Sequence, residues 1–278
     1  AVNDFLTALP VHTMARLLGV PASEREPTCR WVAQFTQGIA SGAGAQAVAR
    51  AHQAAEALMA QGQALGHIPV ANLRRVVDGP VEPGATMLVV GLGTGVNAAP
   101  VHPGAAGRIV PPSECGHVNM PVRSDEDFRL VRFVEARLAA EGTVPHAGVE
   151  EMLAGRGLAN LHAFAAAEAG RPATLTSAEV LAALAACDPV ADHAARLYVH
   201  ILAEMLADLA LIHLPYGGIY LIGGMSRAMT PHLLALDLGR QFRQPRRVDL
   251  LEKKFSVTVV EDDYAALTGC AAYLNQIG

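Results

Sequence analysis

The sequence has few aromatic residues, no paired cysteines and little charge, and each shortage excludes a class of protein. Aromatic residues make up 5% of the 278 positions and charged residues 17%, whereas hydrophobic residues make up 51%. Much of that apolar fraction is alanine, which predicts closely packed helices. Four cysteines, at positions 29, 115, 187 and 270, form no Cys-x-x-Cys pair. Neither a zinc site nor a disulfide framework is therefore indicated.

The sequence also lacks an uninterrupted apolar run that could cross a bilayer. The best candidate, residues 197–214, contains His200, Glu204 and Asp208, and this pattern favours a buried core helix. No basic stretch followed by an apolar core opens the chain. The net charge of −5 disfavours nucleic acid, and the basic cluster at 243–247 is too short to reverse that expectation. We expect a cytoplasmic protein that binds neither membrane nor nucleic acid.

Hydrophobic spacing divides the chain into a helix-rich beginning and an α/β remainder. Residues 6–64 are alanine-rich and interrupted by breaker clusters, and α/β character starts near Leu73. The spacing predicts strands at 86–90, within 216–225 and within 255–263. It predicts helices at 125–140, 147–154, 157–169 and 176–186, the last capped by Thr176 or Ser177. A long helix follows Pro189 and ends before Pro215, and residues 264–276 form a closing helix.

Glycines cluster where the first strand ends, in "MLVVGLGTGVNAAP" at 87–100. Only glycine lets peptide N–H groups approach an anion such as phosphate closely, although a loose turn would also explain the cluster. Strand, glycine turn and helix are expected twice, at 86–95 and at 218–226, which suggests a nucleotide across the sheet edge. Val96 stands where the dinucleotide fingerprint needs its third glycine, and no lysine follows to make a P-loop.

Six motifs in a fixed order resemble those of bacterial glucokinases: "NDF" (3–5), "GLGTGV" (91–96), "ECGHVNMP" (114–121), "EEMLAGRGLANLH" (150–162), "GGIYLIGGM" (217–225) and "ALTGCAAYL" (266–274). The resemblance implies the α/β actin-like ATPase fold, which is of the ribonuclease H-like type. It implies that residues 69–278 are largely the larger, C-terminal domain. Residues 1–68 would form a helical segment, and the last helix, at about 264–276, would pack on the small domain.

The resemblance also assigns roles to individual residues. Asp4 would be the catalytic base and Asn3 its sugar-binding neighbour, and Glu114, His117 and Glu150 would hold the hexose. The nucleotide would lie on glycine-rich backbone, contributed by Gly91, Gly93, Thr94, Gly95, Gly223 and Gly224. Each role has a simpler alternative. Asp4 could cap a helix, Glu114 and His117 could be ordinary loop residues, and Glu150 could place charge in a first helical turn. Gly217 and Gly218 could serve a turn alone.

The chain departs from the family pattern in four places. The D-x-G-G-T strand that grips the phosphates is not found in these 278 residues. Asn97 and Cys115 replace glycines, and Arg156 replaces a proline. The resemblance and these departures together leave two expected functions. The first is Mg²⁺- and ATP-dependent phosphorylation of glucose or a close hexose at its 6-hydroxyl, by a chain that pairs as a homodimer as the family does. The second is a sugar-binding or regulatory relative that transfers no phosphate. An unrelated nucleotide-binding α/β protein is a third, remote alternative.

Overall fold

The structure, a computed structural model, describes residues 68–105 and 107–262. Six strands form one sheet in the order β1-β6-β5-β2-β3-β4. Their bounds are β1 Leu73–Val77, β2 Met87–Leu92, β3 Val96–Gly104, β4 Gly107–Ile109, β5 Ile219–Ile222 and β6 Val257–Val260. The expected helices within 6–64, the residues Asn3 and Asp4, and the closing helix at 264–276 lie outside the described residues.

The middle of the sheet is parallel and its flanks are antiparallel. β2 pairs with β5 and β5 with β6 in parallel, while β1 pairs with β6, β3 with β2, and β4 with β3 in antiparallel fashion. Gly91 near the end of β2 lies opposite Ile222 at the end of β5. The loops that leave these two strands therefore begin side by side at one edge of the sheet.

The first glycine turn corrects a sequence-based expectation. Residues 93–95 join β2 to β3 as a hairpin, with Leu92 opposite Val96 and Met87 opposite Val101, so the helix expected after this turn was wrong. The apolar residues 96–101 return along β2, and this pairing depends on a partner strand that local spacing cannot reveal. The second turn is as expected, because β5 leads through Gly223 into helix α9 (Gly224–Ala235).

The helices expected at 125–140, 157–169, 176–186 and after Pro189 are confirmed with small changes of length, whereas the one expected at 147–154 is only a single turn. The observed helices are α4 Asp125–Ala140, α5 Glu150–Leu153, α6 Gly155–Glu168, α7 Ser177–Ala185 and α8 Pro189–His213, and α10 Leu238–Phe242 follows α9. Thr176 caps α7 in a capping box with Glu179. Asp188 caps α8, with Pro189 as its first residue.

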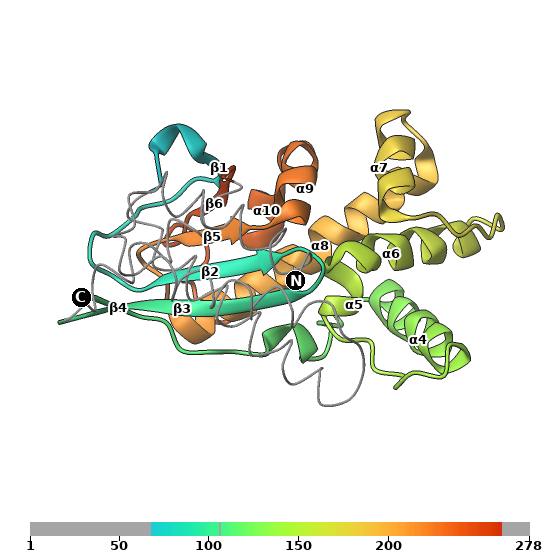
Figure 1. Cartoon of the computed structure of the whole chain (residues 1–278), viewed down its shortest axis with the longest axis horizontal. Coiled ribbons are helices and arrows are strands. Elements are labelled where there is room, and N and C mark those ends of the chain that lie inside the picture. The colour runs from blue at the N-terminus through green and yellow to red at the C-terminus, as the bar shows by residue number, and fades with distance from the viewer. Residues whose placement is uncertain (1–67, 106, 263–278) are drawn as a thin grey trace, which may run out of the picture.

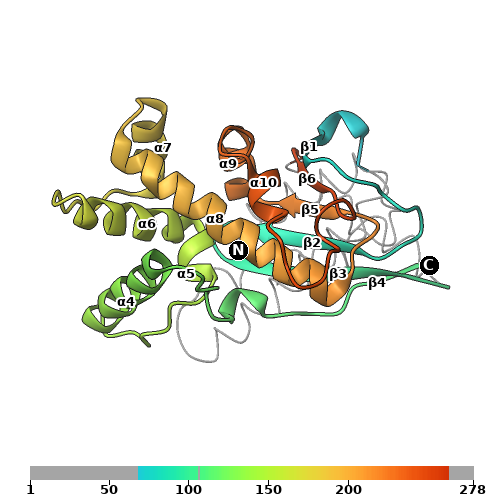
Figure 2. The ribbon, with the colours of Figure 1, turned by 180° about the vertical axis from the view of Figure 1, so that it is seen from behind.

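Alternate residues of the central strands face two different clusters of buried side chains. Leu88 and Val90 belong to the same buried cluster as Leu202 and Leu206 of α8, and Figure 2 shows α8 lying across this face of the sheet. Val89 belongs to a second cluster made of strand and loop residues. Figure 1 shows α4, α5, α6 and α7 beyond one end of the strands. α8 is thus the buried core helix that its sequence predicts, and no helix of the described chain is long and apolar enough to cross a membrane.

Candidate functional site

The two glycine turns meet at the carboxyl ends of β2 and β5. Gly223 has φ +97°, a conformation that favours glycine. A β-carbon added to Gly223 would lie 2.4 Å from the carbonyl oxygen of Leu92. Gly93 donates its N–H to the Gly95 carbonyl at 3.0 Å, which closes the first turn tightly. Gly223 is therefore a glycine because the second turn approaches the end of β2 so closely.

Open space lies beside part of both turns. A β-carbon added to Gly93 or Gly224 would meet no atom within 4 Å. α9 begins at Gly224 with no side chain bonded to its first N–H groups, and such a helix start favours an anion. Gly91 lies instead inside β2, paired with Asn97 and Ile222. Gly93 and Gly224, rather than Gly91, therefore present backbone that a phosphate could approach.

Glu150 at the start of α5 is fixed directly against the first turn. Its Oε2 accepts a hydrogen bond from the Val96 N–H at 2.9 Å, across 54 residues of sequence. A β-carbon on Gly95 would lie 2.8 Å from the same oxygen, and one on Gly116 would lie 3.3 Å from it. The side chain of Glu150 is 17% exposed. Glu150 thus joins the first turn to the loop of Glu114 and His117.

The Glu114 and His117 side chains lie at the surface of that loop. Oε2 of Glu114 and Nε2 of His117 are 3.9 Å apart, with 49% and 64% of the side chains exposed. Glu114 immediately precedes the short 3-10 helix Cys115–His117, and His117 is the last residue of that helix. Because Gly116 touches both Val96 and Glu150, the structure brings these three predicted residues into one region beside the first turn.

Asn97, one of the departures from the family pattern, anchors this loop. Its buried side-chain amide donates to the Ser113 carbonyl. Its Oδ1 accepts from the N–H groups of Ala98 at 2.8 Å and Cys115 at 3.3 Å. A glycine could make none of these side-chain bonds. Asn97 therefore ties the loop to β3 where the family pattern has no side chain.

Arg156 in the first turn of α6 connects several of these groups. Its Nη2 donates to Oε1 of Glu150 at 2.6 Å and to Oε1 of Glu151 at 2.7 Å. Its Nε lies 3.0 Å from Oε2 of Glu151, and its Nη1 lies 3.3 Å from the Thr94 carbonyl. The hydrogen bonds to Glu151 and Glu150 raise the pKa of the guanidinium against the opposing effect of burial. The sequence showed Arg156 only as a departure, because its partners are brought together by the bend between α5 and α6.

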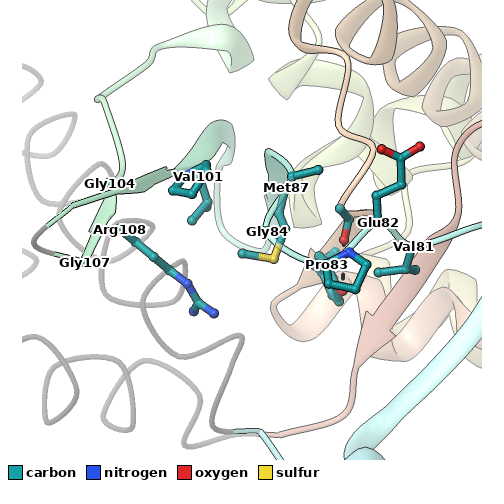
Figure 3. Close-up of a pocket in the computed structure, with 13 residues that line it drawn as sticks. Val81, Glu82, Pro83, Gly84, Met87, Val101, Gly104, Gly107 and Arg108 are labelled. Atoms are coloured by element: carbon teal, nitrogen blue, oxygen red, sulfur yellow. Dashed lines mark hydrogen bonds between the residues drawn. The ribbon is translucent and has the colours of Figure 1, made fainter.

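A cavity of about 420 Å³ lies at the other end of the strands. It is lined by Met87 at the start of β2, Val101 and Gly104 of β3, Tyr220, Arg108 and the loop 81–85. Figure 3 shows the Arg108 side chain extending from the β3–β4 hairpin on the side of the sheet that carries Met87 and Val101. Since Met87 and Leu92 are the two ends of β2, this cavity is separate from the region of the glycine turns.

Within residues 68–105 and 107–262, no three histidine, cysteine or acidic side chains are grouped to hold a metal ion. The turns fit an anionic ligand at Gly93 and Gly224, where an added β-carbon would meet no atom within 4 Å.

Comparison with known proteins shows the family to which the chain belongs. A family model described as Glucokinase matches residues 41–277. The glucokinase of Mesorhizobium japonicum is 33% identical over 204 residues, covering 73% of this chain and 58% of that protein. The glucokinase of Cupriavidus metallidurans is 32% identical over 215 residues, covering 76% and 62%. The chain thus spans about three fifths of the length of these relatives.

Solved structures show the same fold. Glucokinase from an Antarctic psychrotroph matches with a TM-score of 0.71 at 26% identity, covering 78% of this chain and 66% of that one. A ROK hexokinase from Thermus thermophilus matches with a TM-score of 0.51 at 18% identity, covering 80% and 65%. The expected fold class, the actin-like fold of glucokinases and ROK sugar kinases, is therefore confirmed.

Proposed function

The chain belongs to the glucokinase family, and on that premise we propose that it binds a hexose and ATP where its two glycine turns meet, for ATP-dependent phosphorylation of glucose. The observation that carries the proposal is the position of Glu150. Its carboxylate is bonded to the N–H of Val96, directly after the first turn, and adjoins the loop of Glu114 and His117. A sugar and a phosphate bound by these groups would be neighbours.

The three side chains suit a hexose chemically. The carboxylates of Glu114 and Glu150 accept hydrogen bonds from hydroxyl groups, and the His117 imidazole can donate or accept. Glu150 is held by backbone and Arg156, whereas Glu114 and His117 are half-exposed or more. A fixed acceptor beside two accessible groups can orient a ring of hydroxyls. Glucose is the proposed hexose because the curated relatives at about 30% identity are named glucokinases.

The turns suit the nucleotide. Peptide N–H groups of Thr94 and Gly95 would bind phosphate oxygens at the turn that the Gly93 N–H closes, and Gly223 and Gly224 would let the adenosine lie close to the chain. ATP supplies the phosphoryl group, and magnesium would arrive with it. Asp4 as base and Asn3 as sugar ligand belong to the same proposal but lie outside the described residues. A cytoplasmic location and a homodimer are also proposed from the family alone.

The test is calorimetry and a coupled assay on the 278-residue chain with glucose, ATP and Mg²⁺. The proposal expects binding of both ligands and turnover. Glu150→Gln should raise the Kd for glucose at least about tenfold, since hydrogen bonds to a charged group are worth about 1.5–3 kcal/mol. Glu135→Gln removes a carboxylate from an exposed ion pair on α4 and should change nothing.

Three results have distinct meanings. Equal glucose affinity in wild type and Glu150→Gln would contradict the assigned site. Sugar binding without ATP turnover would favour the sugar-binding or regulatory relative over the kinase. Failure to bind either glucose or ATP would contradict the proposed function altogether.

A further inference from the structure

Arg156 closes a ring of hydrogen bonds that runs from the first glycine turn to the proposed hexose carboxylate and back. From Thr94 the ring passes through the Arg156 guanidinium to Oε1 of Glu150. It returns from Oε2 of Glu150 to the Val96 N–H, two residues after Thr94. Both carboxylate oxygens of Glu150 are thereby fixed, and each keeps a lone pair for a further donor.

The guanidinium is not fully used by this ring. Of its five N–H groups, Nε and both protons of Nη2 serve Glu150 and Glu151, and one proton of Nη1 serves Thr94. Within residues 68–105 and 107–262, the second Nη1 proton has no hydrogen-bond partner. The side chain is 48% exposed, compared with 17% for Glu150 and 18% for Glu151. A cation with an available donor therefore lies beside the turn that would receive phosphate.

We propose that Arg156 is a positioning residue that couples the two ligands, so that nucleotide phosphate at the first turn and hexose at Glu150 increase each other's affinity. This inference rests on the proposed function. Phosphate at the turn would hold the guanidinium by its exposed Nη1, and the held guanidinium would keep the Glu150 carboxylate oriented for the sugar. Whichever ligand binds first would restrict the motion of the Arg156 guanidinium and the Glu150 carboxylate. The second ligand would then bind to groups that are already ordered, so the coupling is reciprocal.

Substitutions at Arg156 distinguish coupling of the two ligands from a role that only holds the Glu150 carboxylate in place. Arg156→Lys keeps a positive charge that can reach Glu150 but lacks the planar fork that joins three partners at once. Arg156→Gln removes the charge. Arg129→Gln is the matched control, since Arg129 is 50% exposed and donates from Nε and Nη2 to Glu168 on α6, in a pair that does not include the glycine turns.

The measurement is calorimetric titration of the 278-residue chain with glucose, in the absence and presence of saturating AMPPNP and Mg²⁺. Wild type and Arg129→Gln should bind glucose about tenfold more tightly with AMPPNP. Arg156→Lys should keep its glucose affinity without nucleotide within about threefold, yet lose the tenfold gain. Arg156→Gln should lose the gain as well, and a cooperative melting curve would establish that this variant is folded.

Each other outcome has one meaning. If Arg156→Lys and Arg156→Gln keep the tenfold gain, or if wild type binds both ligands without any gain, the coupling role is overturned while the proposed function stands. If wild type binds neither ligand, the proposed function fails and this inference fails with it.

Discussion

Replacing Gly116 by alanine tests the contact between the proposed sugar loop and the first glycine turn. A β-carbon at this position would lie 2.0 Å from the Val96 carbonyl oxygen, 3.0 Å from its carbon and 3.3 Å from Oε2 of Glu150. Ordinary contact begins near 3.4 Å, so the loop must retreat by about 1.4 Å from a backbone atom of a sheet strand. The strand is the firmer partner, because Val96 begins β3 and pairs with Leu92.

The retreat of the loop should lower both the stability of the protein and its affinity for glucose. Overpacking of this kind costs about 1–3 kcal/mol, and each kcal/mol lowers the Tm of a domain of this size by about 2–4 °C. Glu114 and His117 flank Gly116 and would move with it. Losing one hydrogen bond between a charged group and a hexose hydroxyl costs about 1.5–3 kcal/mol, which raises the Kd for glucose more than about tenfold.

The assay compares Gly116→Ala with Gly155→Ala by calorimetry with glucose and with AMPPNP, and by thermal unfolding. A β-carbon on Gly155 would lie 3.7 Å from the Gly93 carbonyl oxygen, an ordinary contact, so this variant should bind glucose as wild type does. Gly116→Ala should lose glucose affinity and keep most of its AMPPNP affinity. A folded Gly116→Ala with unchanged glucose affinity would refute the reasoning that this loop holds the sugar.

Three further perturbations test the surroundings of the site. Burial raises the pKa of the Cys115 thiol to about 11. At pH 7.5 iodoacetamide should therefore label this thiol about 100-fold more slowly than an ordinary exposed thiol, as measured by peptide mass spectrometry. Labelling at the ordinary rate would contradict this burial. The hydrogen bond to Asp127 raises the pKa of His200, against a smaller effect of burial. Its stabilisation is therefore complete below the ordinary histidine pKa of about 6.5 and is lost as the pH rises through the raised pKa. Urea unfolding should show a larger loss for His200→Gln at pH 6 than at pH 9, and equal losses would exclude this pairing. Thr176→Ala should cost about 1 kcal/mol in the same assay and Thr176→Ser much less, because only the alanine removes the cap of α7; equal costs would contradict capping.

Local signals in the sequence were sufficient where the physics is local. α4 spans Asp125–Ala140 as its spacing predicts, because Ser124 forms a capping box and the apolar residues repeat at helical intervals. α8 begins at Pro189 and ends at His213, shortly before Pro215. In both helices the start and stop signals lie within a few residues of the ends that they determine.

Long-range pairing was not predicted by the same signals. A helix was expected after the first glycine turn, yet residues 96–104 form one strand that pairs with β2. β1 was missed because its partner, β6, follows it by about 180 residues. The approach of Glu150 to Val96 and the ring through Arg156 likewise depend on separate elements meeting, which a motif in the sequence does not describe.

The most direct test of the proposed binding site is a crystal structure of this chain with glucose and AMPPNP soaked into the crystals. We expect the hexose to contact Glu114, His117 and Glu150, and the phosphates to bind the backbone of residues 93–95. Glucose found instead in the cavity beside Arg108 and Tyr220, with the glycine turns free of nucleotide, would contradict it.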